Sequence, residues 1–369
     1  AFLIVLYNNL VYVLNKLLGN VKYFYYIGYM KLSIITNYTS RGYVNEQFIF
    51  NKLCSTLDIP SNDIFDFNTT NTAYNINENY THVLVLIDYK ITNVNIYKEC
   101  LDNITIPKIF IIDMVPQKHK EIYLKEKISS HFPFTSLSKH LQNLLYDQCA
   151  DGFIFYSKLD QDLFKDYYIV DNKKPSTIIP PSLGKKEDIK IKFKDFKPNK
   201  LIGTNCSPSI SNGFLNFSNI MGNLKDYSLD IYGAHGREDV FGEGIINDLT
   251  STLPNINFKG KLKNTKLFFS SYHIYYSAVI YDSFDYFTFL SILNGMVPIL
   301  TENTGTSSFF KSYPFQSNGT PESIKYNINL ITNTHPDYLK EILTNTLKGL
   351  LKLNDSLSKE KYYTFLNGF

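Results

Sequence analysis

Apolar and polar residues follow one another along the chain in blocks, and residues 272–305 define the clearest strand–helix–strand unit. The expected elements are a strand at 277–281, a helix at 284–294 and a second strand at 297–301. Asp282 and Ser283 form a short loop after the first strand, and Gly295 ends the helix. This loop opens onto the amino end of the helix, where unpaired N–H groups and the helix dipole favour an anion. Asp282 and Ser283 are therefore candidates for contact with a phosphate or a ribose, although many such units bind nothing.

The same alternation of strands and helices occupies two longer stretches of the chain. In the first, strands are expected at 32–36, 63–67, 82–87, 108–112 and 151–157, and helices at 44–57, 118–128 and 136–149. In the second, strands are expected at 200–204, 229–232 and 257–258, and helices at 213–224 and 241–253. Residues 69–81 are polar and rich in asparagine, which predicts a loop, and residues 335–353 predict an amphipathic helix in a mostly helical tail. The pattern predicts an α/β fold with mainly parallel sheets.

Residues 184–199 are rich in charge and poor in periodicity, which predicts a solvated interdomain linker. A length of 369 residues agrees with two domains. The net charge of +3 is small for this length, so charge gives no support to a nucleic-acid partner. The four cysteines lie far apart and have no histidine at metal-ligand spacing, so we expect a reduced, cytoplasmic chain without a structural metal.

Residues 1–29 are apolar, but asparagine and lysine residues interrupt them, so they do not predict a clean membrane span. They also lack the basic start and the small-residue cleavage site of a signal peptide. Met30 is followed at once by the first strand, and we expect the folded domain to begin there. Two interpretations of residues 1–29 stay open: an N-terminal extension or loosely packed helix, and an anchor that makes peripheral contact with a membrane surface.

Two doubly wound halves place the carboxyl ends of two sets of strands on facing sides of a cleft, where ligands bind in open parallel sheets. In the first half, Arg41 and Gly42 lie in the loop after the first strand, and Asp113 and His119 lie in the loop after the fourth. Asp113 directly follows its strand and is a candidate base. His119 could act as a base too, but a simple surface position is the favoured interpretation.

In the second half, the loop after the first strand contains Asn205, Asn212 and Gly213. Asn205 and Asn212 could bind a diphosphate without charge, although an N-cap role is the favoured interpretation for Asn212. Gly233 permits a close approach of the backbone to a ligand, and an ordinary turn glycine explains it equally well. The signatures of dinucleotide-binding, P-loop, zinc-protease and α/β-hydrolase proteins are absent, which leaves nucleotide-sugar chemistry well placed.

Several segments resemble, in order and spacing, the nucleotide-sugar glycosyltransferases of GT-B fold, of the group 1 or family 4 type. The donor-site signature of that family is roughly E-x-F-G-x-x-x-x-E-A-x-x-x-G-x-P-V-I. This chain has Asp282-Ser283-Phe284-Asp285, then residues 290–295, then Pro298-Ile299-Leu300. Residues 150–157, 176–184, 201–214, 229–236 and 256–262 are similar to further motifs of the family. The resemblance implies two Rossmann-like doubly wound domains that face a cleft, followed by a C-terminal helical tail.

The resemblance also implies a division of labour along the chain. The implied parts are an N-terminal extension at 1–29, an acceptor domain at 30–184, a linker at 185–199, a donor domain at 200–334 and C-terminal helices at 335–369 that pack back across the cleft. The implied activity is metal-independent transfer of a sugar from a nucleotide-diphosphate sugar to a hydroxyl group of a glycan, lipid or small molecule. The implied catalytic residues are Asp282 and Asp113; the donor-binding residues are Asn205, Asn212, Gly213, Gly233, Lys261, Ser283, Phe284 and Gly295; and the acceptor-binding residues are Arg41, Gly42 and His119.

This sequence departs from the family pattern at positions that carry charge. The second glutamate of the signature falls on Leu290, and the usual basic residues fall near Asn205 and Asn212. Positive charge for a diphosphate must then come from residues such as Lys261 or from helix amino ends. Two alternatives therefore stay open: a catalytically degenerate GT-B protein that binds glycans or partners, and another two-lobed sugar-nucleotide enzyme such as an epimerase.

Overall fold

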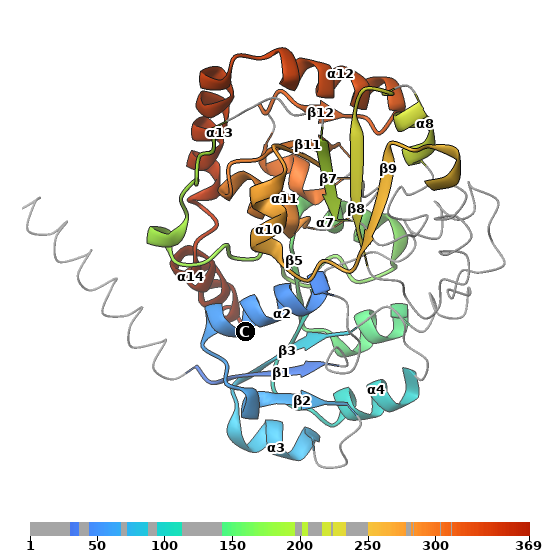
Figure 1. The fold of residues 1–369 in the computed structure, drawn as a ribbon. Helices are drawn as coiled ribbons and strands as arrows, with labels where there is room; N and C mark the ends of the chain where they lie inside the picture. Colours follow the sequence, from blue (N-terminus) through green and yellow to red (C-terminus); the bar gives the residue numbers. More distant parts are fainter. Residues whose placement is uncertain are drawn as a thin grey trace, which may run out of the picture.

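Two parallel sheets with flanking helices form the two halves of the molecule, one above the other in Figure 1. The structure is a computed structural model, and it describes residues 30–36, 44–67, 72–87, 94–112, 142–195, 201–205, 216–222, 224–233, 250–277, 282, 284–302, 304–310 and 312–369. The architecture confirms the predicted fold class of two Rossmann-like units with a helical tail.

The first sheet has the strand order β2-β1-β3-β4-β5-β6, and all neighbouring pairs are parallel. Its strands are β1 (Leu32–Thr36), β2 (Ile64–Asp66), β3 (His82–Leu86), β4 (Lys108–Ile112), β5 (Gly152–Phe155) and β6 (Ser176–Ile178). The helical elements of this half are α2 (Val44–Leu57), η2 (Ser61–Asp63), α3 (Thr72–Asn79), α4 (Val94–Asp102), the π-helical turn η4 (Leu145–Cys149) and α7 (Lys158–Tyr167). β1 and β3 are buried along their whole length, as expected of a parallel sheet covered on both faces.

The second sheet has the strand order β12-β11-β10-β7-β8-β9, again with parallel neighbours. Its strands are β7 (Leu201–Asn205), β8 (Ser228–Tyr232), β9 (Ile256–Gly260), β10 (Ile274–Tyr276), β11 (Val297–Thr301) and β12 (Gln316–Ser317). Its helical elements are α8 (Asn216–Gly222), α10 (Thr265–Ser271), α11 (Tyr286–Leu293) and η6 (Gly305–Phe309). The strand order reverses between β7 and β10, and ligands of open parallel sheets bind at the carboxyl ends of strands at such a switch point.

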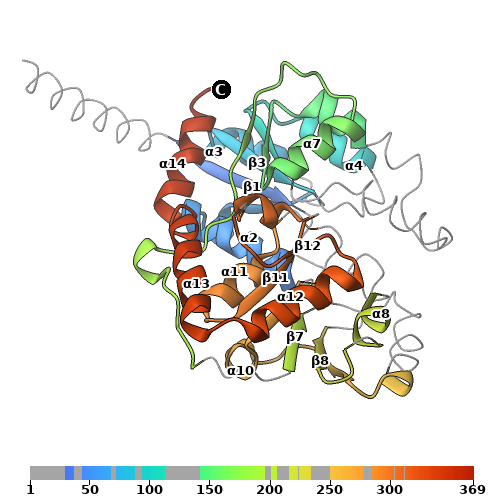
Figure 2. The ribbon, with the colours of Figure 1, turned by 90° about the horizontal axis from the view of Figure 1, so that it is seen from above.

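Three helices follow the second sheet: α12 (Pro321–Asn333), α13 (Pro336–Leu350) and α14 (Asp355–Leu366). Thr320, His335 and Asn354 precede them, and each side chain accepts a hydrogen bond from a backbone N–H of the first turn. α12 packs against β11 and β12, whereas α14 packs against α2 of the first half. Figure 2 shows α13 between these two places, so the tail contacts both halves.

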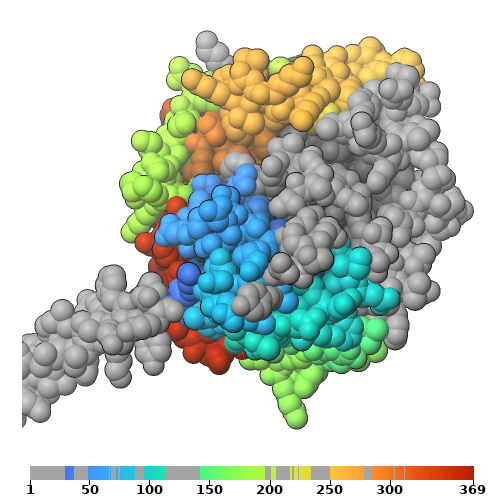
Figure 3. Space-filling model, turned by 90° about the horizontal axis from the view of Figure 1, so that it is seen from below, coloured from blue at the N-terminus to red at the C-terminus, as the bar shows by residue number. Residues whose placement is uncertain are grey.

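One apolar core continues from the second half into the first. It includes Leu53 and Leu57 of α2, Phe289 of α11 and Tyr362 of α14. α11 packs against α2, and their surfaces, orange and blue, adjoin in Figure 3. A second, aromatic-rich cluster lies on the opposite face of the first sheet, because alternate residues of β1 and β3 belong to the two clusters.

The strands predicted at 32–36, 108–112 and 297–301 coincide with β1, β4 and β11, and the helix predicted at 44–57 coincides with α2. The strand predicted at 277–281 is wrong at Ser277, which follows the end of β10 (Ile274–Tyr276), and residues 278–281 lie outside the described residues. Tyr275 and Tyr276 of β10 are buried and pair with β11 in register. These tyrosines look amphipathic in the sequence but are core residues in the fold.

The loop predicted at 69–81 is also wrong, because residues 72–79 form α3. Ala73 and Ile76 face the core on one side of this helix. The asparagines that suggested a loop make hydrogen bonds in the fold: Asn79 Nδ2 donates to Asn75 O at 2.9 Å, and Asn77 Oδ1 accepts from Thr105 N at 2.8 Å. A short helix with two apolar contacts and satisfied amides leaves almost no 3.6-residue apolar pattern in the sequence.

The charged segment predicted as a solvated linker is mostly exposed over residues 185–195, but it also makes specific contacts with the second half. It contains the short helix η5 (Lys186–Asp188), and the side chain of Ile189 is only 3% exposed. Lys192 N donates to Leu293 O at 2.8 Å, and Lys194 Nζ donates to Tyr272 O at 2.9 Å. One buried isoleucine and hydrogen bonds to backbone carbonyls therefore anchor this segment, and the alternating charges of its sequence give no sign of these contacts.

Candidate functional site

The parallel strands of the second sheet end at one common edge. In register, Asn205 of β7 lies opposite Tyr232 of β8, and Tyr232 lies opposite Gly260 of β9. Below, the term carboxyl edge denotes the residues at or just beyond the ends of β7, β8, β9 and β10: Asn205, Gly233, Lys261 and Asp282. The fold thus places four of the predicted site residues along one edge of the second sheet: Asn205 and Asp282 follow the two strands at the switch point, and Gly233 and Lys261 follow the next two strands, β8 and β9.

Asp282 is held in place by backbone contacts on both sides. It forms an isolated parallel bridge with Thr304, and its carbonyl oxygen accepts a hydrogen bond from Gly305 N at 2.8 Å. Its Oδ1 accepts a hydrogen bond from Phe284 N at 2.9 Å, which closes a tight turn of the kind that aspartates often form. The side chain is half-buried. Asp282 is therefore a carboxylate in a fixed position just beyond the ends of β10 and β11.

Asp285 is a second carboxylate three residues later, and it caps α11. Its side chain is 2% exposed, and its Oδ1 accepts a hydrogen bond from Thr288 N at 3.1 Å. Its Oδ2 accepts hydrogen bonds from Ser277 Oγ and Thr288 Oγ1, both at 2.5 Å. Its backbone N donates to Thr306 Oγ1 at 2.8 Å. A buried carboxylate is tolerated here because hydroxyl and N–H donors surround it and because it lies at the positive end of the helix dipole.

Phe284 and Leu290 of the donor signature are packing residues in this structure. The ring of Phe284 is 1% exposed and stacks on Phe289 at a centroid distance of 4.4 Å. Leu290 is half-buried and packs against two of the apolar clusters, so no side-chain oxygen occupies the position of the second signature glutamate. The backbone N–H of Phe284 is bound to Asp282, as described above.

Gly233 and Lys261 lie on adjacent strands of the carboxyl edge. Gly233 N donates to Gly260 O at 3.0 Å, and Gly260 has a positive φ of 69°, which turns the chain so that the exposed Lys261 follows directly. Gly295, in contrast, lies at the other end of α11, about 12 Å away along a helix of eight residues. Its φ is 74°, and a Cβ atom there would lie 2.4 Å from Lys192 O.

The other predicted site residues lie outside the described residues. They are Arg41, Gly42, Asp113, His119, Asn212, Gly213 and Ser283, and for Asn205 the structure describes the backbone only. Their assignments stay predictions.

The first half approaches the carboxyl edge through α7. This helix packs against η6, which begins at Gly305 beside Asp282. Ser157 caps α7: its Oγ accepts from Asp160 N at 3.2 Å and donates to Asp160 Oδ2 at 2.6 Å. Sequence reasoning did not single out this pair, although Ser-x-x-Asp is close to the capping-box spacing that marks a helix start.

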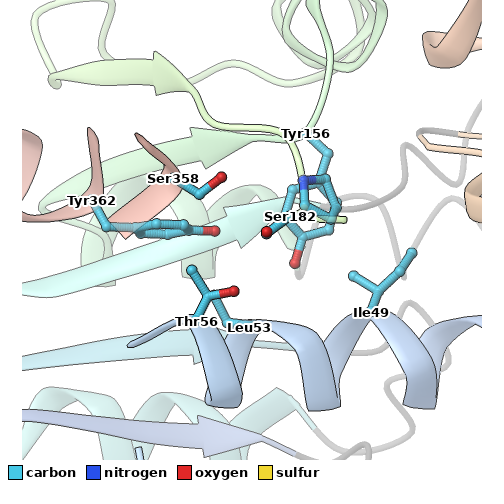
Figure 4. Close-up of a pocket in the computed structure, with 8 residues that line it drawn as sticks. Ile49, Leu53, Thr56, Tyr156, Ser182, Ser358 and Tyr362 are labelled. Carbon is cyan, nitrogen blue, oxygen red and sulfur yellow. The ribbon is translucent and has the colours of Figure 1, made fainter. Parts of the chain in front are cut away.

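A small pocket lies where α2, α14 and the segment after β6 meet (Figure 4). Its volume, open solvent included, is about 220 Å³, below the ~300–1,000 Å³ of typical small-molecule sites. Hydroxyl groups of Thr56, Ser182 and Ser358 contribute to its lining, and Ser182 Oγ donates to Asp355 Oδ1 at 2.6 Å. The pocket therefore belongs to the joint between the first half and the tail, and not to a nucleotide site.

Two features are absent from the described residues. No group of three or more histidine, cysteine, aspartate or glutamate side chains in that part of the chain could hold a metal ion. Over the same residues, no helix has the length and apolar character needed to cross a membrane.

Comparison with solved structures identifies the fold. HepE of Anabaena, solved in complex with UDP and glucose, covers 92% of this chain and 100% of its own with a TM-score of 0.69 and 10% identity. Sucrose-phosphate synthase from Thermosynechococcus elongatus covers 89% and 81% with a TM-score of 0.66 and 10% identity. A UDP-forming alpha,alpha-trehalose-phosphate synthase from Burkholderia xenovorans covers 89% and 80% with a TM-score of 0.56 and 14% identity.

These structural neighbours are GT-B glycosyltransferases, and this chain has the GT-B fold that its sequence motifs implied. No family model and no curated protein sequence matches the chain. At identities of 10–14%, the shared feature is the fold.

Proposed function

We propose that this protein is a metal-independent GT-B glycosyltransferase that moves a sugar from a nucleotide-diphosphate sugar to a hydroxyl group of a glycan, a lipid or a small molecule. In this reaction the bond between the anomeric carbon and the diphosphate oxygen breaks, and a bond from the anomeric carbon to the acceptor oxygen forms. The acceptor proton passes to a base. The site has to stabilise positive charge at the anomeric carbon and negative charge on the departing diphosphate.

The position of Asp282 is the observation that carries this proposal. A half-buried carboxylate, fixed by Phe284 N and by the bridge to Thr304, lies beyond the strand ends at the switch point of the second sheet. Ligands of open parallel sheets bind at such a place. The similar structure of HepE was solved in complex with UDP-glucose. In our proposal Asp282 positions the donor sugar.

Other residues receive roles in the proposal from the family resemblance. The donor contacts are Asn205, Asn212, Gly213, Gly233, Lys261 and Ser283. Phe284 and Gly295 receive no donor contact in the proposal, because the Phe284 ring is 1% exposed and Gly295 lies at the opposite end of α11. On the first-half side, Asp113 is the second catalytic carboxylate, and Arg41, Gly42 and His119 bind the acceptor. Among these, Lys261 is exposed and directly follows the end of β9, which supports a role beside the diphosphate.

One observation favours a second candidate, a GT-B protein that binds glycans or partners without catalysis. Leu290 packs into the core where the family signature has a glutamate, so the site lacks one carboxylate of the usual pair. Asp285 replaces the signature glycine and puts a buried negative charge at the amino end of α11. Both changes alter the charge around an incoming diphosphate.

The two candidates separate in a screen of the full-length protein with UDP-, GDP- and other activated sugars, read out by donor hydrolysis, by sugar transfer and by calorimetric binding. With the nucleotide sugar that the wild type uses as donor, Asp282→Asn is expected to lower the rate of sugar transfer by about 100-fold. The asparagine amide keeps the hydrogen bond from Phe284 N but loses the negative charge. Asp171→Asn is the matched control: Asp171 Oδ1 also accepts from a backbone N two residues later, at 2.9 Å, but follows α7 in the first half.

Equal activity of the wild type and Asp282→Asn would show that the Asp282 carboxylate has no role in catalysis. Binding of UDP without hydrolysis or transfer of any sugar would favour the non-catalytic candidate. Conversion of a nucleotide sugar without an acceptor, to an isomer of the same mass, would favour an epimerase instead.

A further inference from the structure

Asp285 binds residues of three segments of the second half that lie within 30 positions of one another in the sequence. Ser277 follows β10, Thr288 lies in the first turn of α11, and Thr306 lies in η6. All three bind Asp285, through its carboxylate or its backbone N. The hydroxyl of Thr301, at the end of β11, donates to Ser277 O at 2.6 Å and extends the network to the neighbouring strand.

The same network reaches Asp282 by a short path. Gly305 N donates to the carbonyl oxygen of Asp282, and the adjacent Thr306 accepts the backbone N–H of Asp285. Asp282 and Asp285 are thus both attached to the first turn of η6. The hydrogen bond from Ser277 to Asp285 also joins the first and last residues of the segment 277–285, in which Asp282 and Phe284 lie.

We propose that Asp285 is a positioning residue for the donor site: its buried carboxylate links Ser277, at the start of the segment 277–285, to α11 at its end, and thereby fixes the orientation of Asp282. This inference rests on the proposed function for its catalytic consequence. The position of the segment is a separate physical claim that can be measured without any donor. Asp285 itself is 2% exposed and is not assigned any contact with the donor.

A simple capping role predicts something different. Several helices of this chain have caps with a single side-chain hydrogen bond, for example Asn264, which accepts from Leu267 N at 2.9 Å and caps α10. Loss of such a cap costs about 1 kcal/mol and has no reason to change ligand binding. Asp285 makes a cap bond too, but it also binds the end of a strand, and only that second function fixes the loop.

The test compares Asp285→Ala, Asp285→Asn and Ser277→Ala with the wild type of the full chain. Asp285→Ala removes the three hydrogen bonds that the carboxylate accepts from Ser277 and Thr288, and it leaves the backbone bond to Thr306 in place. Asp285→Asn removes the charge but keeps one acceptor for Thr288 N and two N–H donors for the hydroxyls of Ser277 and Thr288. Ser277→Ala is the milder variant that stays informative if Asp285→Ala does not fold.

Ser291→Ala is the matched control for Ser277→Ala. Both serines are buried and each donates one hydrogen bond, but Ser291 Oγ binds Thr288 O within α11 and has no bond to the segment 277–285. Asn264→Ala is the control for loss of an ordinary cap.

Two readouts are needed. With UDP-glucose as the probe, calorimetry is expected to show about 10-fold weaker binding for Asp285→Ala, about 3-fold for Ser277→Ala, and affinities close to the wild type for Asp285→Asn and both controls. Without any ligand, hydrogen exchange of the peptide covering 277–285 is expected to accelerate at least about 10-fold in Asp285→Ala and to a lesser extent in Ser277→Ala, and to stay unchanged in the controls.

Unchanged exchange in Asp285→Ala and Ser277→Ala overturns the proposal, whatever the ligand data show. Faster exchange with unchanged UDP-glucose affinity also overturns it, because the segment would then be fixed without consequence for the donor. If neither the wild type nor any variant binds UDP-glucose or another activated sugar, the proposed function fails, and the exchange data alone decide whether Asp285 fixes the segment.

Discussion

The two ends of α11 are built in different ways. At the amino end, Asp285 gathers hydroxyl and N–H groups from several segments beside the carboxyl edge. At the carboxyl end, Gly295 brings the backbone against Lys192 of the segment 185–195, where a side chain has no room. The amino end depends on hydrogen bonds between polar side chains, which a substitution can remove one by one. The carboxyl end depends on contact between two stretches of backbone.

This difference separates ligand binding from stability within one helix of eight residues. Substitutions at the amino end alter groups that fix Asp282, so they should change donor binding more than stability. Substitutions at the carboxyl end force the backbone apart, so they should change stability and leave the affinity of the folded protein alone. The predictions below challenge this division, starting with the largest expected effect.

Gly295→Ala should destabilise the protein by about 3 kcal/mol. A left-handed backbone conformation costs an alanine roughly 1 kcal/mol relative to glycine, and the new Cβ would lie 2.4 Å from Lys192 O, which is a backbone atom that cannot rotate away. Urea denaturation measures the loss, and calorimetry with UDP-glucose measures the affinity of the folded fraction, which should stay unchanged.

Gly222→Ala is the control for Gly295→Ala. Gly222 ends α8, and a Cβ atom there would meet nothing within 4 Å. Its free energy of unfolding should stay the same or rise by up to about 1 kcal/mol, because alanine restricts the unfolded chain. A Gly295→Ala variant as stable as Gly222→Ala would show that the segment 185–195 is not packed against α11 as described.

Phe284→Leu tests whether every residue at the amino end serves the ligand. The Phe284 ring stacks on Phe289 and contacts Phe309 edge-on, away from solvent. We expect a loss of about 1–2 kcal/mol in the free energy of unfolding and no change in UDP-glucose affinity. Phe289→Leu breaks the same stack from the other side and should give the same two results. A weaker affinity in Phe284→Leu alone would assign the side chain of Phe284 to the donor site.

The fold and the candidate site differ in how far the sequence could predict them. β11 and α2 are clear in the sequence because β-branched runs and long apolar periods mark them, and their ends were predicted correctly. Asp282 could be placed because the motif spacing survives there. α3 was missed because its two core residues, Ala73 and Ile76, are surrounded by asparagines whose hydrogen bonds exist only in the folded chain.

The Asp285 network could not be predicted for a related reason. In the sequence, Asp285 is an aspartate at a signature glycine, and Ser277, Thr288 and Thr306 are three unremarkable hydroxyl residues spread over 30 positions. Only the parallel pairing of β10 with β11 and the turn into η6 bring them together. Lys194 was misjudged for the same kind of reason, because a charged run suggests solvent, whereas the long stem of a lysine can lie along an apolar surface.

Lys194 at the carboxyl end of α11 gives the smallest predicted effect, and its sign depends on pH. Burial lowers the pKa of the Lys194 ammonium to about 8. Its Nζ donates to Tyr272 O, at the carboxyl end of α10, where a helix favours a cation. Burial and the nearby Lys194 ammonium also lower the pKa of His273, so the histidine titrates in a separate, more acidic window.

The pKa of Lys194 is lower in the folded state than in the unfolded chain, so the unfolded chain binds more protons above pH 8. The free energy of unfolding therefore increases as the pH rises towards 10. Below pH 8 both states carry the charge, and its burial disfavours folding.

Lys194→Met removes the titration, so the stability of the wild type relative to this variant should rise between pH 8 and pH 10. After a discount for partial solvent access, we expect a rise of about 1 kcal/mol. Urea midpoints across this range, with Lys192→Met as the exposed-lysine control, measure it. A constant difference between wild type and Lys194→Met would mean that the ammonium is as well solvated as the charged sequence first suggested.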